Sequence, residues 1–331
     1  MRTLTPAVHL LTLTALSACG GLHLDLINHS VKKPSNVAVY FTVDRSNGDP
    51  VPGLTADHFR IFEDGQPVSV LESKQVILNP EVAAAHYTLL LVDMSGSVTQ
   101  SGQVPALQSA AQAFTTRVEK YQKVGVYAFD GSPNLTAIAG FGSAGGASHA
   151  VSALSGYHPR DPSTNLHGAV AQGVQTLEHA LNSAQQPLKF GTLVVFTDGT
   201  DHAGRVTRDD MMKAVDEAPF DIFAIGVGAE IDAHELRAIG RTGTVIESNP
   251  QAVQQAFEQI AARIEGYSRR YYLLSYCSPA RAGEHQLEIE AVAPDGATGR
   301  LYDRFNAAGF GPQCDPNAPP AFSLTRPVRK K

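Results

Sequence analysis

The sequence predicts an α/β fold with a doubly wound, mostly parallel sheet, inserted in or flanked by a small antiparallel β-sandwich. First, apolar runs alternate with amphipathic helical patterns over residues 85–270, which is typical of a parallel sheet covered on both faces. Second, short alternating segments separated by turn signals precede and follow this region, and such spacing indicates antiparallel strands. Third, neither flanking stretch is long enough for a comfortable domain of its own, so we expect the two to pair with each other.

In the central region, each element is predicted from its own pattern. Buried apolar runs predict strands at 87–93, 123–130, 193–198 and 221–227. Helical periodicity predicts helices at 104–121, 166–184, 208–218 and 251–270. Residues 134–142 are expected to form a short antiparallel edge strand. Asn249 and Pro250 supply a cap and a first-turn proline for the last helix.

The two flanking stretches are expected to form one β-sandwich. Its first part is predicted at 36–80, where Gly-Asp-Pro and Asp-Gly turns separate alternating segments. Its second part is predicted at 271–314, with strands at 271–276, 285–292 and 300–305.

The start of the chain is expected to direct export, and its end is expected to be disordered. Residues 1–18 have one early positive charge and a short apolar stretch, which predicts a signal peptide. The motif Leu-Ser-Ala-Cys at 16–19 resembles a bacterial lipobox, and this implies cleavage before Cys19, lipidation of that cysteine and attachment to a membrane. The alternative is an ordinary secretory signal with an incidental cysteine. Gly20 follows instead of Asp, so the bacterial outer membrane is the expected location. Residues 19–35 are interpreted as a lipid anchor and tether, and the Pro-rich basic stretch 315–331 as a disordered tail.

Polar residues follow the apolar runs where a parallel sheet places its ligand sites. Asp93, Ser95 and Ser97 come directly after one run, Asp198 ends another, and Thr164 stands before a long helical stretch. Carboxylate and hydroxyl oxygens suit a hard cation such as Mg²⁺ or Mn²⁺. The sequence therefore predicts one metal site made from these five residues.

The order Asp-x-Ser-x-Ser, then Thr, then Asp resembles the metal-ion-dependent adhesion site of the von Willebrand factor A domain family. The resemblance covers residues 85–270. It implies that the five residues hold a cation with one position left open, and that a partner protein fills that position with an Asp or Glu side chain. His167, His202 and Asp201 follow Thr164 and Asp198 closely and are candidates for the rim of the site.

Other interpretations remain open at this stage. The five residues favour helix caps and turns as well, because Ser, Thr and Asp form local hydrogen bonds there. The chain is interpreted as a non-enzymatic envelope lipoprotein that binds a protein partner, and the alternative is a scaffold subunit with a structural or absent metal. A hydrolase would need a general base, and only His167 or His202 is in place to serve as one.

Charge and cysteine content restrict the interpretation further. The formal charge is −6, and −7 once Arg2 is removed with the signal peptide. No basic stripe interleaved with aromatic residues is present, so nucleic acid is not an expected partner. Cys277 and Cys314 remain if Cys19 carries lipid, and an even pair in an exported protein predicts a disulfide, with two buried free thiols as the alternative.

Overall fold

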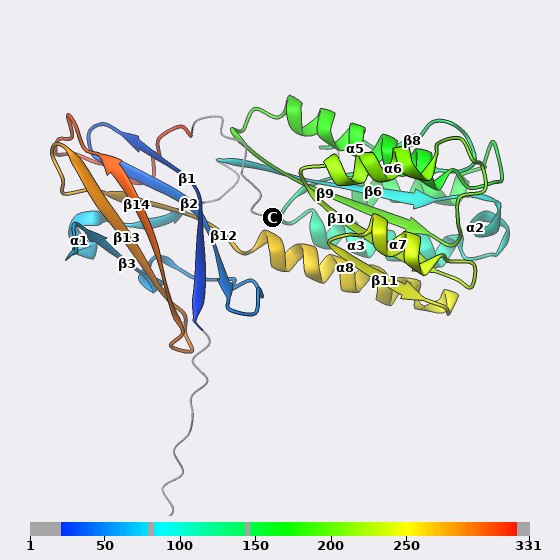
Figure 1. Ribbon diagram of the computed structural model, residues 1–331, viewed down its shortest axis with the longest axis horizontal. Coiled ribbons are helices and arrows are strands. Elements are labelled where there is room, and N and C mark those ends of the chain that lie inside the picture. Colours follow the sequence, from blue (N-terminus) through cyan, green and yellow to red (C-terminus); the bar gives the residue numbers. More distant parts are fainter. Residues whose placement is uncertain (1–20, 79–82, 143–145, 323–331) are drawn as a thin grey trace, which may run out of the picture.

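The computed structural model describes residues 21–78, 83–142 and 146–322. It has two parts side by side along the long axis, an antiparallel β-sandwich and an α/β part (Figure 1). The predicted fold class is confirmed. Cys19 and the predicted signal peptide, residues 1–18, lie outside the described residues.

The sandwich has two antiparallel sheets of four strands each. The first has the order β1-β2-β12-β5, with bounds Leu22–Lys32, Asn36–Arg45, Tyr271–Cys277 and Val76–Leu78. The second has the order β14-β13-β3-β4, with bounds Thr298–Asn306, Glu284–Val292, Phe59–Glu63 and Gln66–Pro67. The turns η1 (Ala56–His58) and α1 (Val70–Ser73) flank β3 and β4. Because β2 pairs with β12 from Thr42↔Tyr271 to Asn36↔Cys277, segments before and after the α/β part share one sheet.

The α/β part is built on a six-stranded sheet in the order β11-β10-β9-β6-β7-β8. In that order the strands are Gly243–Glu247, Asp221–Val227, Leu188–Thr197, Ala84–Asp93, Lys123–Phe129 and Thr136–Ala139. All pairs are parallel except β7 with β8, which is antiparallel as expected for an edge strand. The carboxyl end of the central strand β6 therefore lies between those of its neighbours.

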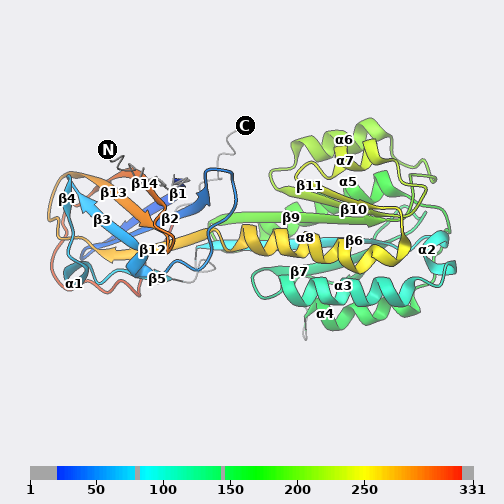
Figure 2. The ribbon, with the colours of Figure 1, turned by 90° about the horizontal axis from the view of Figure 1, so that it is seen from below.

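Helices cover both faces of this sheet (Figure 2). One face carries α3 (Val104–Val118), α4 (Ala147–Ala150), η3 (Val151–Gly156), η4 (Pro250–Ala252) and α8 (Val253–Ser268). The other carries α5 (Leu166–Ser183), α6 (Arg208–Glu217) and α7 (Ala233–Ile239). Alternate residues of β6 divide between the two cores, since Leu90 packs toward α3 and α8 while Leu89 and Leu91 pack toward α5. The described helices include none that is long and apolar enough to cross a membrane.

The predicted tether over residues 19–35 is wrong for most of its length. Residues Leu22–Lys32 form β1, which pairs antiparallel with β2. Leu22 and Leu24 alternate with polar residues and are buried in the sandwich core. This alternation is the signal of a half-buried strand.

The predicted disordered tail over 315–331 is wrong in its first part. The side-chain amide of Asn36 donates to the carbonyl oxygens of Asp315 (2.7 Å) and Ala318 (2.8 Å). Phe322 is buried, with its ring 6.5 Å from that of Tyr40. The predicted disulfide between Cys277 and Cys314 is confirmed, and it ties this segment to the end of β12. Residues 323–331 lie outside the described part.

Candidate metal site

The first loop of the site begins where β6 ends, and Asp93 is fully buried there. The backbone N–H of Ser95 donates to Asp93 Oδ1 (2.9 Å), and the hydroxyl of Thr197 donates to Asp93 Oδ2 (2.7 Å). Both carboxylate oxygens are thus held in place by the chain itself. Thr197 is the last residue of β9, and its contact with Asp93 was not predicted from the sequence. Its position next to Asp198 was the only feature of the sequence that pointed to the site.

Four of the five predicted residues form one connected group. The hydroxyl oxygens of Ser95 and Ser97 lie 3.1 Å apart, and the Ser97 hydroxyl donates to Asp198 Oδ1 at 2.9 Å. Ser95 in turn contacts Asp93 through its backbone. Two carboxylates at neighbouring strand ends therefore bracket a pair of hydroxyl groups.

Thr164 is buried on a loop, residues 161–165, that adjoins the group. The backbone N–H of Gly96 donates to the carbonyl of Pro162 (2.8 Å). The N–H groups of His202 and Ala203 both donate to the Thr164 carbonyl (2.9 Å each). The structure thus brings Thr164 between the loop that follows Asp93 and the loop that follows Asp198, through backbone contacts.

Gly96 allows this close approach. A Cβ at position 96 would lie 2.9 Å from Pro162 Cβ and 3.0 Å from the Pro162 carbonyl oxygen, so a larger residue would push the two loops apart. The position of Gly96 between Ser95 and Ser97 was the feature of the sequence that could have indicated this close approach.

The electrostatics of the group favour a cation. Burial, together with the nearby charge of Asp198, raises the pKa of Asp93 to about 7, against the hydrogen bonds from Ser95 and Thr197. Burial also raises the pKa of Asp198. Within the described ranges, neither carboxylate forms an ion pair with a lysine, arginine or histidine. A buried carboxylate without a positive partner is costly, and the donors here are all oxygens. The residues therefore fit Mg²⁺ or Mn²⁺.

Asp130 ends the neighbouring strand in the same way but has a different role. Its Oδ2 accepts from the Tyr157 hydroxyl (3.0 Å) and the Arg160 N–H (2.8 Å), while its Oδ1 accepts from the Ser132 N–H (2.7 Å). These bonds lower the pKa of Asp130 although burial opposes them. Asp130 thus anchors the chain that leads to Thr164, a role that its sequence position did not distinguish from metal binding.

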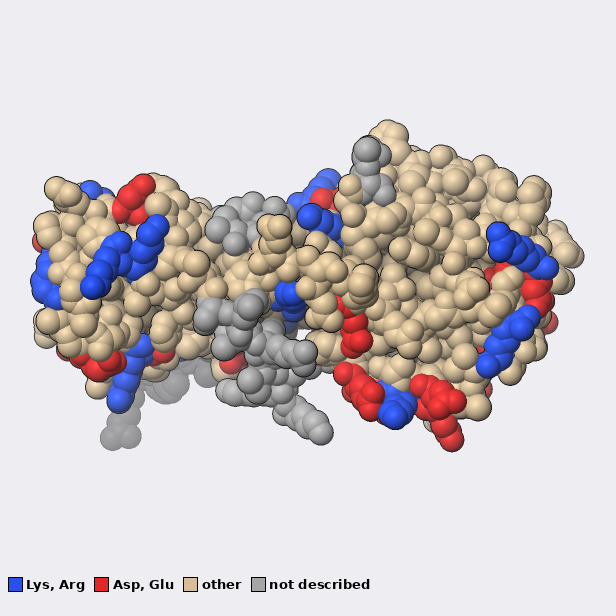
Figure 3. All heavy atoms as spheres, turned by 90° about the horizontal axis from the view of Figure 1, so that it is seen from above, with Lys and Arg blue, Asp and Glu red and all other residues tan. Residues whose placement is uncertain are grey.

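The predicted rim residues take different places. Asp201 accepts from the backbone N–H groups of Gly204 (3.0 Å), in its own loop, and His167 (3.0 Å), at the start of α5, so it joins the two. His202 is exposed, and its backbone contacts Thr164. Figure 3 shows side chains of both charge signs at this end of the α/β part.

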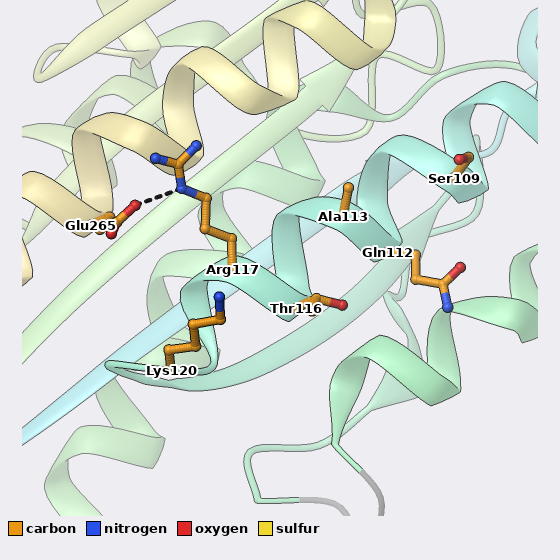
Figure 4. A pocket seen from close by; sticks show the side chains of 7 residues that line it. All are labelled: Ser109, Gln112, Ala113, Thr116, Arg117, Lys120 and Glu265. Atoms are coloured by element: carbon orange, nitrogen blue, oxygen red, sulfur yellow. Dashed lines mark hydrogen bonds and ion pairs between the residues drawn. The ribbon is translucent and has the colours of Figure 1, made fainter.

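A shallow groove on the outer face of α3 lies apart from these residues (Figure 4). The ion pair between Arg117 and Glu265 (2.6 Å) closes one side of it. Its lining residues are Ser109, Gln112, Ala113, Thr116, Arg117, Lys120 and Glu265. None of them belongs to the candidate metal site.

Comparison with solved structures gives several distant neighbours. A von Willebrand factor type A protein from Catenulispora acidiphila is 13% identical, with a TM-score of 0.47, and the match covers 88% of this chain and 74% of that chain. Proximal thread matrix protein 1 from the mussel byssus, solved with a zinc-occupied MIDAS motif, is 15% identical with a TM-score of 0.44 over 54% of this chain. Manganese-loaded TRAP protein from Plasmodium vivax is 13% identical with a TM-score of 0.45, and the match covers 72% of this chain and 98% of that chain.

The chain spans about half of the mussel protein, 48% of its length. A comparison with curated proteins found no match. The sequence profile of the von Willebrand factor type A domain matches residues 89–260, which is more than half of the chain and contains all five residues of the candidate metal site. The chain therefore belongs to the von Willebrand factor type A domain family.

Proposed function

We propose that the α/β part binds a partner protein through a divalent cation, Mg²⁺ or Mn²⁺, held by Asp93, Ser95, Ser97, Thr164 and Asp198. The observation that carries this proposal is a pair of carboxylates, Asp93 fully buried and Asp198 half-buried, joined through two serine hydroxyls and paired with no basic side chain in the described ranges. A structural relic would gain nothing from keeping two acids together without a counter-charge.

The proposed partner supplies an Asp or Glu side chain. A cation bound largely by neutral hydroxyls would retain positive charge that a partner carboxylate can contact in a strong charge-assisted interaction. Ser97 is exposed while Asp93 is buried, so the site opens to solvent on the serine side. The loops around it would provide the remaining contacts and hence specificity.

Substitution of Ser97 tests the proposal with a matched control. Ser97→Ala removes one hydroxyl from the site, whereas Ser101→Ala removes a hydroxyl that donates to the Val98 carbonyl (2.8 Å) in the same segment. Wild type and Ser101→Ala should melt at higher temperature as Mg²⁺ is added, because a ligand that binds only the folded state stabilises it, by about 2.7 kcal/mol at 100 times its Kd. Ser97→Ala should bind Mg²⁺ at least roughly tenfold more weakly.

The same titrations separate adhesion from a scaffold role. If wild type shows no Mg²⁺- or Mn²⁺-dependent shift in melting, the metal site is refuted. If a shift occurs but partner capture from envelope extract is unaffected by EDTA, the ion is structural and the scaffold alternative holds.

We also propose that the protein works in a bacterial cell envelope, attached through lipid on Cys19 to the outer membrane. The export signal, the lipobox-like residues 16–19 and the disulfide in the sandwich support this placement, since disulfides persist in oxidising compartments.

A further inference from the structure

His167 occupies a central position behind the metal site. It is the second residue of α5, three residues after Thr164. Its backbone N–H donates to Asp201 Oδ1 (3.0 Å). Its ring Nε2 lies 2.8 Å from Glu235 Oε1, and its ring Nδ1 lies 3.2 Å from the Val206 carbonyl oxygen.

Both ring nitrogens therefore contact acceptors. Glu235 lies against Nε2, and Asp201 Oδ2 lies 3.8 Å from Nδ1. The side chains of His167 and Glu235 are only 13% and 12% exposed, so solvent screens these contacts weakly.

The contacts of His167 join three elements that follow three different strands. His167 begins the helix after Thr164, Asp201 and Val206 belong to the loop after Asp198, and Glu235 lies on α7. Arg208, at the start of α6, also contacts Glu235 (Nε to Oε1, 3.5 Å). The His167 contacts, together with the bonds from the His202 and Ala203 N–H groups to the Thr164 carbonyl, therefore tie the loop after Asp198 to the start of α5.

We propose that His167 is a positioning residue for the metal site: it fixes the loop that carries Asp198 against the start of α5 and so holds Asp198 and Thr164 at the spacing that a cation requires. The proposal rests on the metal-binding function proposed above. Groups that orient metal ligands commonly change metal affinity roughly 10- to 100-fold when they are removed.

The test compares His167→Ala, His167→Gln and, as a matched control on the same helix, the exposed His179→Ala. For each variant, the Mg²⁺ dissociation constant is measured by calorimetry, and the melting temperature is measured in EDTA. We expect roughly tenfold weaker Mg²⁺ binding in His167→Ala, unchanged binding in His179→Ala, and partial recovery in His167→Gln, whose amide N–H can still donate to Glu235. Amide hydrogen exchange over residues 199–207 should rise in His167→Ala without metal.

The outcomes separate this inference from the proposed function. Wild type that fails to bind Mg²⁺ overturns the proposed function and with it the role of His167. Wild type that binds, together with His167→Ala that binds equally well, overturns the positioning role alone. A His167→Ala variant with a lower melting temperature in EDTA but an unchanged Mg²⁺ dissociation constant shows a purely structural histidine and also overturns it.

Discussion

His86 shows how a single buried residue makes stability depend on pH. It lies near the start of β6, is almost fully buried, and its Nε2 lies 3.1 Å from the Tyr40 hydroxyl. Its ring stacks on Phe190 at 4.8 Å and tilts against Tyr271 at 5.0 Å. Because burial disfavours the charged ring, the pKa of His86 falls from 6.5 to about 4.

We predict that His86 destabilises the protein as the pH falls from 6.5 toward 4. In this window the unfolded chain takes up a proton that the folded protein does not, so the free energy of unfolding decreases with decreasing pH. The contribution of His86 to the free energy of unfolding is fully present above pH 6.5. It has decreased by about 3 kcal/mol when the pH reaches the folded pKa of about 4. In urea unfolding at pH 7 and pH 4.5, a Tyr40→Phe/His86→Phe variant should lose less stability between the two pH values than Tyr40→Phe alone. Equal losses would show that His86 does not cause the pH dependence.

The elements that the sequence predicts best are those with a strong period. The strand predicted at 221–227 agrees with β10, and the helix predicted at 104–121 agrees with α3 to within its last turn. The edge strand β11 and the short helix α7 were not predicted. Val245 is the one buried residue among the five of β11, and Thr244 and Glu247 are polar. The strand therefore lacks the continuous apolar run of a central strand.

The candidate metal ligands could be predicted because they adjoin strongly patterned elements, whereas the residues that hold them in place could not. Asp93 and Asp198 each follow an apolar run, and strand ends in a parallel sheet meet at one edge. The contacts of His167 with Glu235 and of Asp130 with Tyr157 join residues 68 and 27 positions apart. Such pairings depend on how loops pack after the strands are in place, and no local pattern encodes them.

At the scale of elements, the disulfide between Cys277 and Cys314 should stabilise the sandwich. It closes a loop with a sequence separation of 37 residues, and its removal should cost about 4 kcal/mol of unfolding free energy on the chain-entropy model. A Cys277→Ser/Cys314→Ser variant should unfold at lower urea concentration yet bind Mg²⁺ with unchanged affinity, because the bridge lies in the sandwich and not at the metal site. Two free thiols in protein isolated natively from cells would contradict the bridge.

At the scale of the whole molecule, the sandwich and the α/β part share a packed junction. Ala38, Tyr40 and Leu273 of the sandwich pack with Ala84 and Leu188 at the starts of β6 and β9. The carboxyl ends of the same two strands carry Asp93 and Asp198. The candidate metal site therefore lies at the far end of the α/β part, away from the sandwich (Figure 1).

This arrangement bears on the proposed lipid anchor. Strand β1 begins at Leu22, three residues after Cys19, a length of chain that spans at most about 10 Å. Lipid on Cys19 would therefore hold the sandwich close to the membrane. The metal site, at the other end of the strands, would then be displaced from the anchor by the length of the α/β part and accessible to a partner.

We therefore predict that Cys19→Ala releases the protein in soluble form or leaves an uncut precursor. Each acyl chain contributes about 0.8 kcal/mol per buried CH₂, and stable attachment needs more than one chain, so loss of the acylated cysteine should end membrane retention. Fractionation of cells followed by immunoblotting measures this, and the Cys277→Ser/Cys314→Ser variant, which keeps Cys19, should stay with the membrane. A processed Cys19→Ala protein that still sediments with membranes would mean that another feature of the chain attaches it, and the placement of the metal site relative to the membrane would then need a different basis.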